Sequence, residues 1–163
     1  MFPWAQGVKI TSNWGENMKR VYVNEKWCLG CRLCEYYCAF ADTGEKDMAR
    51  ALKDIKINPR IKIEEKDGIS FAVNCRHCRE PLCVKGCITG GLSVIDGVVS
   101  IDKEKCVSCY TCVLCCPFGA VSPSESGAVQ KCELCVNEGA HPACVKGCPN
   151  AAIVYEDRTE AKM

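Results

Sequence analysis

Cysteine is the residue type in this chain with the most chemical potential, because 17 of the 163 residues are cysteines. Sixteen of them fall into four groups of four, which we call quartets one to four. Quartets one and three share the spacing C-x2-C-x2-C-x3-C, whereas quartets two and four have longer central gaps. In chain order the quartets are Cys28, Cys31, Cys34, Cys38; Cys75, Cys78, Cys83, Cys87; Cys106, Cys109, Cys112, Cys116; and Cys132, Cys135, Cys144, Cys148.

The short spacing is the one with which bacterial cysteines bind [4Fe–4S] clusters. Three cysteines at i, i+3 and i+6 can wrap a tight loop around three iron corners of one cluster. Pro117 and Pro149 follow the last cysteine of quartets three and four. Since proline suits the first turn of a helix, we expect that cysteine to open a helix. The four quartets predict four [4Fe–4S] clusters, with all sixteen quartet cysteines as iron ligands.

Structural zinc is the main alternative interpretation. Zinc sites commonly use two separated C-x2-C pairs that close a tetrahedron, whereas every quartet here ends in C-x3-C. A zinc-stapled interaction module is therefore the remote hypothesis, and metal analysis would separate zinc from iron. The leftover Cys115 is interpreted as a small buried apolar residue rather than a ligand.

Charge and hydropathy exclude several function classes. The formal net charge is +1, and four clusters with their thiolates would bring it to roughly −7. No basic run interleaved with aromatics suggests nucleic acid, and no long apolar run suggests membrane insertion. No export signal is visible, so a cytoplasmic location is expected. Basic residues beside the quartet cysteines could raise the reduction potentials of bound clusters. They are Arg32, Arg76, Arg79, Lys85, Lys105, Lys131 and Lys146.

The elements that must position the cysteines are short. We expect strands at Val21–Asn24 and Ala152–Glu156, and hairpins that turn at Asp67-Gly68 and Asp96-Gly97. A helix is expected over Glu45–Ile55, and a loop over Val121–Val129. The predicted fold class is a small α+β fold of short hairpins and short helices, dominated by its clusters, because units this small cannot bury an ordinary apolar core.

The chain also repeats internally. Pro81–Cys87 and Pro142–Cys148 end quartets two and four with nearly the same residues, and quartets one and three share their spacing. The short–long, short–long order indicates a duplicated ferredoxin unit. No nucleotide-binding, phosphate-binding or nucleophile motif appears, so we expect no catalytic residue in this chain.

With these quartets the chain resembles the four-cluster ferredoxin-type electron-transfer subunits that accompany dimethyl-sulfoxide and nitrate reductases, formate dehydrogenases and formate hydrogenlyase. Within that group it is most similar to the iron–sulfur protein associated with carbon monoxide dehydrogenase, and similar subunits serve tungsten aldehyde oxidoreductases. The residues that carry this resemblance are Arg20–Val23, Cys28–Glu35, Phe71–Cys78 and Cys87–Gly90.

The resemblance implies that quartets exchange ligands in pairs. Each cluster would take three cysteines from one quartet and the fourth cysteine from another. The implied sets are Cys28, Cys31, Cys34 with Cys148; Cys132, Cys135, Cys144 with Cys38; Cys75, Cys78, Cys83 with Cys116; and Cys106, Cys109, Cys112 with Cys87. The outer and inner quartets would then form two ferredoxin-like lobes within residues 21–156. Residues 1–20 would be an extension that contacts a partner, and residues 157–163 a polar tail.

The function that follows is a non-catalytic subunit that relays low-potential electrons. The implied partner is a catalytic oxidoreductase subunit of the carbon monoxide dehydrogenase or tungsten aldehyde oxidoreductase type. A ferredoxin, or a flavin- or NAD-linked subunit, is a candidate for the second carrier. The alternative is a free soluble polyferredoxin that serves several enzymes.

Overall fold

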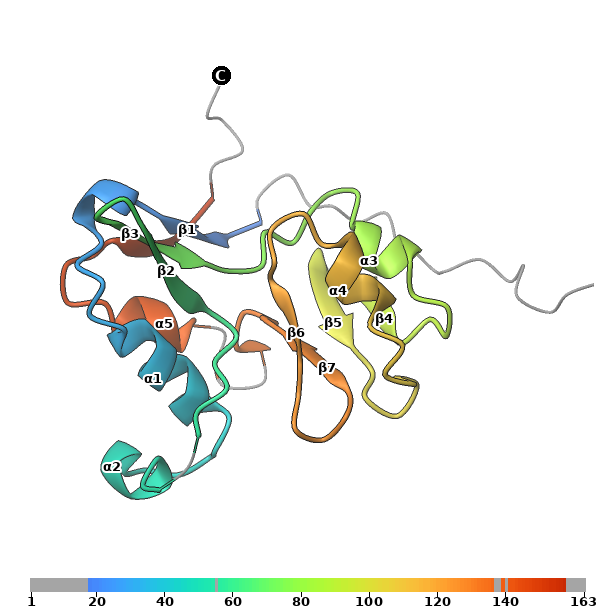
Figure 1. The fold of residues 1–163 in the computed structure, drawn as a ribbon, viewed down its shortest axis with the longest axis horizontal. Helices are drawn as coiled ribbons and strands as arrows, with labels where there is room; N and C mark the ends of the chain where they lie inside the picture. The colour runs from blue at the N-terminus through green and yellow to red at the C-terminus, as the bar shows by residue number, and fades with distance from the viewer. Residues whose placement is uncertain (1–17, 55, 137–138, 140, 158–163) are drawn as a thin grey trace, which may run out of the picture.

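Residues 18–54, 56–136, 139 and 141–157 are described by the structure, a computed structural model. Most of the predicted extension at residues 1–20 and of the predicted tail at residues 157–163 lies outside this part of the chain. The described residues form short helices and short antiparallel strand pairs (Figure 1). The prediction of a small α+β fold built from short hairpins and helices is confirmed.

Every strand pairs antiparallel with one other strand in the described part of the chain. Three of the pairs are hairpins, and the fourth joins the two ends of the described region. The pairs are β1 (Arg20–Val23) with β8 (Ile153–Glu156), β2 (Lys62–Lys66) with β3 (Ile69–Val73), β4 (Leu92–Ile95) with β5 (Val98–Ile101), and β6 (Val121–Pro123) with β7 (Val129–Lys131).

The two predicted hairpin turns are confirmed. Asp67-Gly68 and Asp96-Gly97 both have positive φ at each residue, which is the conformation that matches the twist of the flanking strands. The loop expected over Val121–Val129 is wrong, because β6 and β7 form a third hairpin there. The Ser124 amide closes its turn by donating to the Ala128 carbonyl at 2.8 Å.

Most of the helices lie next to quartet cysteines. The helical segments of the described residues are a 3-10 turn (Glu25–Trp27), α1 (Leu33–Ala41), α2 (Met48–Ala51), α3 (Leu82–Lys85), α4 (Thr111–Cys115) and α5 (Ala143–Lys146). The expected helix over Glu45–Ile55 shortens to α2, which Asp47 caps through a hydrogen bond to the Arg50 amide at 3.1 Å.

The expectation that the fourth cysteine of a quartet opens a helix is wrong. In quartets two to four the helix begins just before or at the third cysteine and ends before the fourth. In quartet one, α1 contains both Cys34 and Cys38. The third and fourth cysteines of each quartet are four residues apart, which in a helix is about one turn, or about 6 Å along its axis.

Two groups of buried apolar residues support these elements. α1 packs against α5, and α3 packs against α4; Figure 1 shows the two helix pairs toward opposite sides of the view. One buried group includes Val21, Ile63 and Ile153, and the other includes Val84, Val99 and Val129. Quartet cysteines belong to both groups or pack against them. Among the described residues, no helix is long and apolar enough to cross a membrane.

Candidate metal centres

The four cysteine loops share one backbone feature. The residue just before the second cysteine of each quartet has positive φ, at Gly30 (66°), His77 (44°), Ser108 (57°) and Leu134 (57°). A left-handed residue among right-handed neighbours turns successive backbone N–H groups toward one side, which creates a concave anion site of the kind that iron–sulfur clusters use. Three of these residues are not glycine, so the loops adopt this conformation against a local steric cost.

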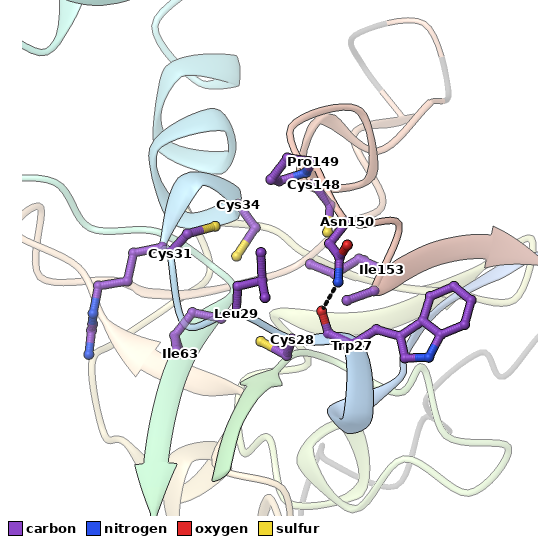
Figure 2. A pocket seen from close by; sticks show the side chains of 12 residues that line it. Trp27, Cys28, Leu29, Cys31, Cys34, Ile63, Cys148, Pro149, Asn150 and Ile153 are labelled. Atoms are coloured by element: carbon purple, nitrogen blue, oxygen red, sulfur yellow. Dashed lines mark hydrogen bonds between the residues drawn. The ribbon is translucent and has the colours of Figure 1, made fainter. Parts of the chain in front are cut away.

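One pocket collects cysteines from both ends of the chain. Cys28, Cys31 and Cys34 line it together with Cys148 from the turn after α5. Figure 2 shows these side chains around the pocket, with Trp27 and Asn150 at its rim. The Asn150 side-chain amide donates to the Trp27 carbonyl at 2.6 Å and so fastens one wall of the pocket to the other (Figure 2).

A second pocket repeats this arrangement with the inner quartets. Cys106, Cys109 and Cys112 line it, and Cys87 completes the set from the turn after α3. Each of the two pockets encloses about 330 Å³, open space at its mouth included. The same pattern of three cysteines from one loop and the last from another therefore occurs twice.

The remaining eight cysteines gather in two further sets, which their mutual electrostatic effects reveal. Burial raises the pKa of the Cys144 thiol, and the neighbouring thiols of Cys132, Cys38 and Cys135 raise it further, as does Cys34 of the first pocket. Burial likewise raises the pKa of Cys78, with further increases from Cys75 and Cys116. Burial also raises the pKa of Cys83, and the thiols of Cys75 and Cys116 add to this increase. The structure thus places Cys132, Cys135 and Cys144 near Cys38, and Cys75, Cys78 and Cys83 near Cys116.

Burial and hydrogen bonding differ among these sets. Burial raises the pKa of Cys34 to about 12, with Glu35 adding to the increase, and raises that of Cys132 to about 12. By contrast, the pKa of Cys87 is lowered: burial opposes this, but amide donors and the Thr89 hydroxyl stabilise the thiolate. The backbone amide and the side-chain hydroxyl of Thr111 lower the pKa of the Cys109 thiol. Hydrogen bonds therefore stabilise the thiolate form at Cys87 and Cys109.

These sites fit a cluster with several metal atoms. Four thiols border a shared space in each pocket. Backbone amides donate to sulfur, as from Arg60 to Cys38 at 3.3 Å and from Leu134 to Cys132 at 3.4 Å. Such donors stabilise the negative charge that a thiolate-bound cluster carries.

Several polar or charged residues beside the quartet cysteines are buried at the sites. Glu35 is buried beside Cys34, and its Oε1 accepts from the Ile63 amide at 2.6 Å. Asn74 is buried before Cys75, and His77 is buried between Cys75 and Cys78. Their only sequence signal is position, because each lies next to a quartet cysteine. Cys115 is half-buried, and its sulfur faces Gly86 of the neighbouring helix end.

Known proteins are similar to this chain in sequence. The family model of the 4Fe-4S dicluster domain matches residues 67–158. An iron-sulfur protein of Rhodospirillum rubrum is 35% identical over 84% of this chain and 81% of its own length. The electron transport protein HydN of Escherichia coli is 34% identical over 82% of this chain and 85% of its own. The formate dehydrogenase iron-sulfur subunit of Haemophilus influenzae is 32% identical over 83% of this chain, which spans half of that subunit.

Proposed function

The chain belongs to the 4Fe-4S dicluster family of iron–sulfur electron-transfer proteins, and from this premise we propose that it is a non-catalytic relay subunit with four [4Fe–4S] clusters. The observation that carries the proposal is the pairing of three cysteines from one quartet with the last cysteine of another in the two pockets. The matched family region, residues 67–158, begins after quartet one. The proposal therefore extends beyond the match to include the loop around Cys28.

We assign the ligands in the same crossed sets. Cys28, Cys31 and Cys34 bind a cluster with Cys148, and Cys106, Cys109 and Cys112 bind one with Cys87; the two pockets support these sets. Electrostatic proximity supports the other two, Cys75, Cys78, Cys83 with Cys116 and Cys132, Cys135, Cys144 with Cys38. When bound, each cluster supplies transfer of one electron without making or breaking a covalent bond.

The crossed sets also define the proposed domain organisation. Two ferredoxin-like lobes share residues 21–156, one from the outer quartets and one from the inner quartets. The α1–α5 and α3–α4 contacts support this division, since each pair joins the helices of two quartets that share clusters. Residues 1–20 are assigned to partner contact and residues 157–163 to a polar tail.

The protein's own residues prepare each site for electron transfer. The left-handed residues before the second cysteines shape the loops, and backbone amides donate to sulfur at Cys38 and Cys132. Because these groups are fixed by the fold, little reorganisation accompanies the gain or loss of an electron. Low reorganisation is what a relay needs.

We propose a catalytic oxidoreductase subunit as the partner, of the carbon monoxide dehydrogenase or tungsten aldehyde oxidoreductase type. A relative that is named a formate dehydrogenase iron-sulfur subunit supports an oxidoreductase partner in general. The narrower assignment rests on the residues that carry the resemblance, such as Cys28–Glu35 and Phe71–Cys78. The second carrier is a ferredoxin or a flavin- or NAD-linked subunit.

Iron and acid-labile sulfide analysis of anaerobically isolated protein tests the proposal. Four clusters require roughly sixteen iron and sixteen sulfide per chain, and paramagnetic resonance signals after dithionite reduction. Roughly eight of each would reduce the proposal to two clusters. Zinc without sulfide would replace it with the zinc-stapled module. Co-purification with a catalytic subunit, in place of a free monomer, separates the relay subunit from a soluble polyferredoxin.

A further inference from the structure

Lys131 is a lysine with almost no access to solvent, at 1% exposed. Its Nζ donates to the Val99 carbonyl at 2.5 Å and to the Cys132 carbonyl at 2.7 Å. Carbonyl oxygens have no formal charge, so these two bonds leave the positive charge of the ammonium unbalanced. Burying such a charge costs several kcal/mol unless opposite charge lies nearby.

Val99 connects this ammonium to a second cysteine loop. The Val99 amide donates to Nδ1 of His77 at 3.1 Å, and His77 lies between Cys75 and Cys78. The carbonyl and amide of one residue in β5 thus contact the loops of quartets four and two respectively. Lys131 Nζ thus contacts the loop of quartet four directly and is linked through Val99 to the loop of quartet two.

The thiols on both sides respond to this charge. Burial raises the pKa of Cys83 to about 11, and the Lys131 ammonium opposes the increase. Burial raises the pKa of Cys132 to about 12, against the opposing effects of the Leu134 amide and of Lys131. Glu133, two residues after Lys131 in the chain, has the opposite charge. Its Oε1 accepts from the Ile101 amide at 2.9 Å, on β5, the strand that also contains Val99.

The internal repeat shows that a charge is not needed to hold the strand. Asn74 occupies the corresponding position before Cys75, and its Nδ2 donates to the Val21 carbonyl at 3.3 Å and to the Cys75 carbonyl at 3.2 Å. A neutral amide thus makes the same two kinds of contact, to a strand carbonyl and to the next cysteine. What Lys131 adds at its own position is the positive charge.

We propose that Lys131 is a positioning residue whose buried charge raises the reduction potentials of the two clusters on either side of it, which makes them the preferred resting places of electrons in the relay. The inference rests on the proposed function. The clusters concerned are those assigned to Cys75, Cys78, Cys83, Cys116 and to Cys38, Cys132, Cys135, Cys144.

Charge balance gives the direction of the effect. A cluster with four thiolates carries a charge of roughly −2, and of roughly −3 once it has taken one electron from a reduced donor carrier. The donor is oxidised by that electron, and no proton or covalent bond is exchanged. A nearby positive charge stabilises the more negative reduced state, so its removal must make reduction harder.

Redox titration of the anaerobically isolated holoprotein, followed by paramagnetic resonance, tests the inference. Lys131→Met and Lys131→Gln should each lower two of the four midpoint potentials. We expect at least a tenfold loss in the reduced-to-oxidised ratio at the wild-type midpoint, which equals 59 mV for a one-electron couple. Lys131→Arg retains the charge and should keep wild-type potentials.

Lys105→Met is the matched control. Lys105 precedes Cys106 as Lys131 precedes Cys132, but it is exposed and paired with Asp102 at 2.8 Å, so its loss should leave all midpoints in place. Unchanged midpoints in fully loaded Lys131→Met, or an Arg variant that matches Met, would overturn the inference.

Asn74→Lys covers the case in which the Lys131 variants fail to load iron. It places a new charge at the corresponding position beside Cys75 and should raise at least one midpoint. If no midpoint rises, the inference is overturned. A wild-type protein without iron and sulfide would instead overturn the proposed function, so the two failures are distinguishable.

Discussion

Cys34 and Cys148 line the same pocket, although they come from opposite ends of the described chain. Cys34 lies at the start of α1, and Cys148 follows α5. The packing of α1 against α5 and the pairing of β1 with β8 bring these ends together. A cluster bound here would therefore join the two ends of the described chain. Its loss should destabilise the fold as well as impair electron transfer.

Removing one cysteine of a set should remove one cluster. We expect Cys148→Ala to lose roughly a quarter of the iron and sulfide, because three ligands remain for one of four clusters. The double variant Cys34→Ala/Cys148→Ala should lose no more, whereas Cys109→Ala/Cys148→Ala should lose about twice as much. Iron and sulfide analysis per chain gives the comparison.

Cys115→Ala is the control for that series, because Cys115 faces Gly86 and lies outside the four assigned sets. It should keep the full iron content. A double variant of Cys34 and Cys148 that loses two clusters would show that these residues serve different sites, and would contradict the crossed assignment.

Removal of the metal should unfold most of the chain. The buried apolar residues form two small groups that depend on cysteine loops, and buried thiols crowd together in them with raised pKa values, as at Cys144. Without clusters these loops lose what holds them together. Circular dichroism and amide exchange before and after chelation should show the loss; a native-like spectrum in the iron-free protein would contradict it.

A pair of backbone positions predicts opposite stability changes. Gly90 and Ala151 occupy corresponding places after the last cysteines of quartets two and four, and both have positive φ, at 66° and 50°. A side chain at Gly90 would meet nothing within 4 Å, so only the backbone matters there. Gly90→Ala should destabilise the protein, and Ala151→Gly should stabilise it, each by about 0.5–1 kcal/mol.

Thermal unfolding of the loaded protein measures both changes, provided that iron content is the same in each variant. Gly44→Ala is a suitable comparison, because Gly44 also has positive φ and open surroundings but lies away from the cysteine loops. If Ala151→Gly were destabilising, the strain inferred at Ala151 would be wrong.

Local signals in the sequence predicted part of the local structure. The Asp-Gly turns fixed two hairpins, because that dipeptide adopts positive φ at both positions with little cost. The β6–β7 hairpin was missed because its turn, Ser124–Gly127, is longer and follows a proline. The helix expected over Glu45–Ile55 was too long, since good helix formers alone do not stabilise a short helix without a packed face.

The arrangement of the sites depended on longer-range information. Spacing alone grouped the cysteines by quartet. Which cysteines lie beside Cys148 or Cys87 depends on which helices pack together. Buried polar residues were the hardest to foresee. Lysine and glutamate are almost never fully buried in proteins, so nothing in the sequence set Lys131 or Glu35 apart from exposed residues of the same type.

Glu35 should affect electron transfer in the opposite direction to Lys131. It is buried next to Cys34, where its Oε1 accepts from the Ile63 amide at 2.6 Å, and its contact with Arg32 Nη1 is longer, at 3.4 Å. A carboxylate here disfavours further negative charge on the neighbouring cluster. Glu35→Gln retains an oxygen that can accept from the Ile63 amide and removes the charge.

We therefore expect Glu35→Gln to raise one midpoint potential, by about 1 kcal/mol or about 40 mV for one electron. The affected cluster should be the one that Cys148→Ala removes, so the same resonance signal must shift in one variant and vanish in the other. Glu64→Gln is the control, because Glu64 is an exposed glutamate in the strand that contains Ile63. A shift in a different signal would place the carboxylate beside another cluster, and an equal shift in both variants would reduce the effect to net charge.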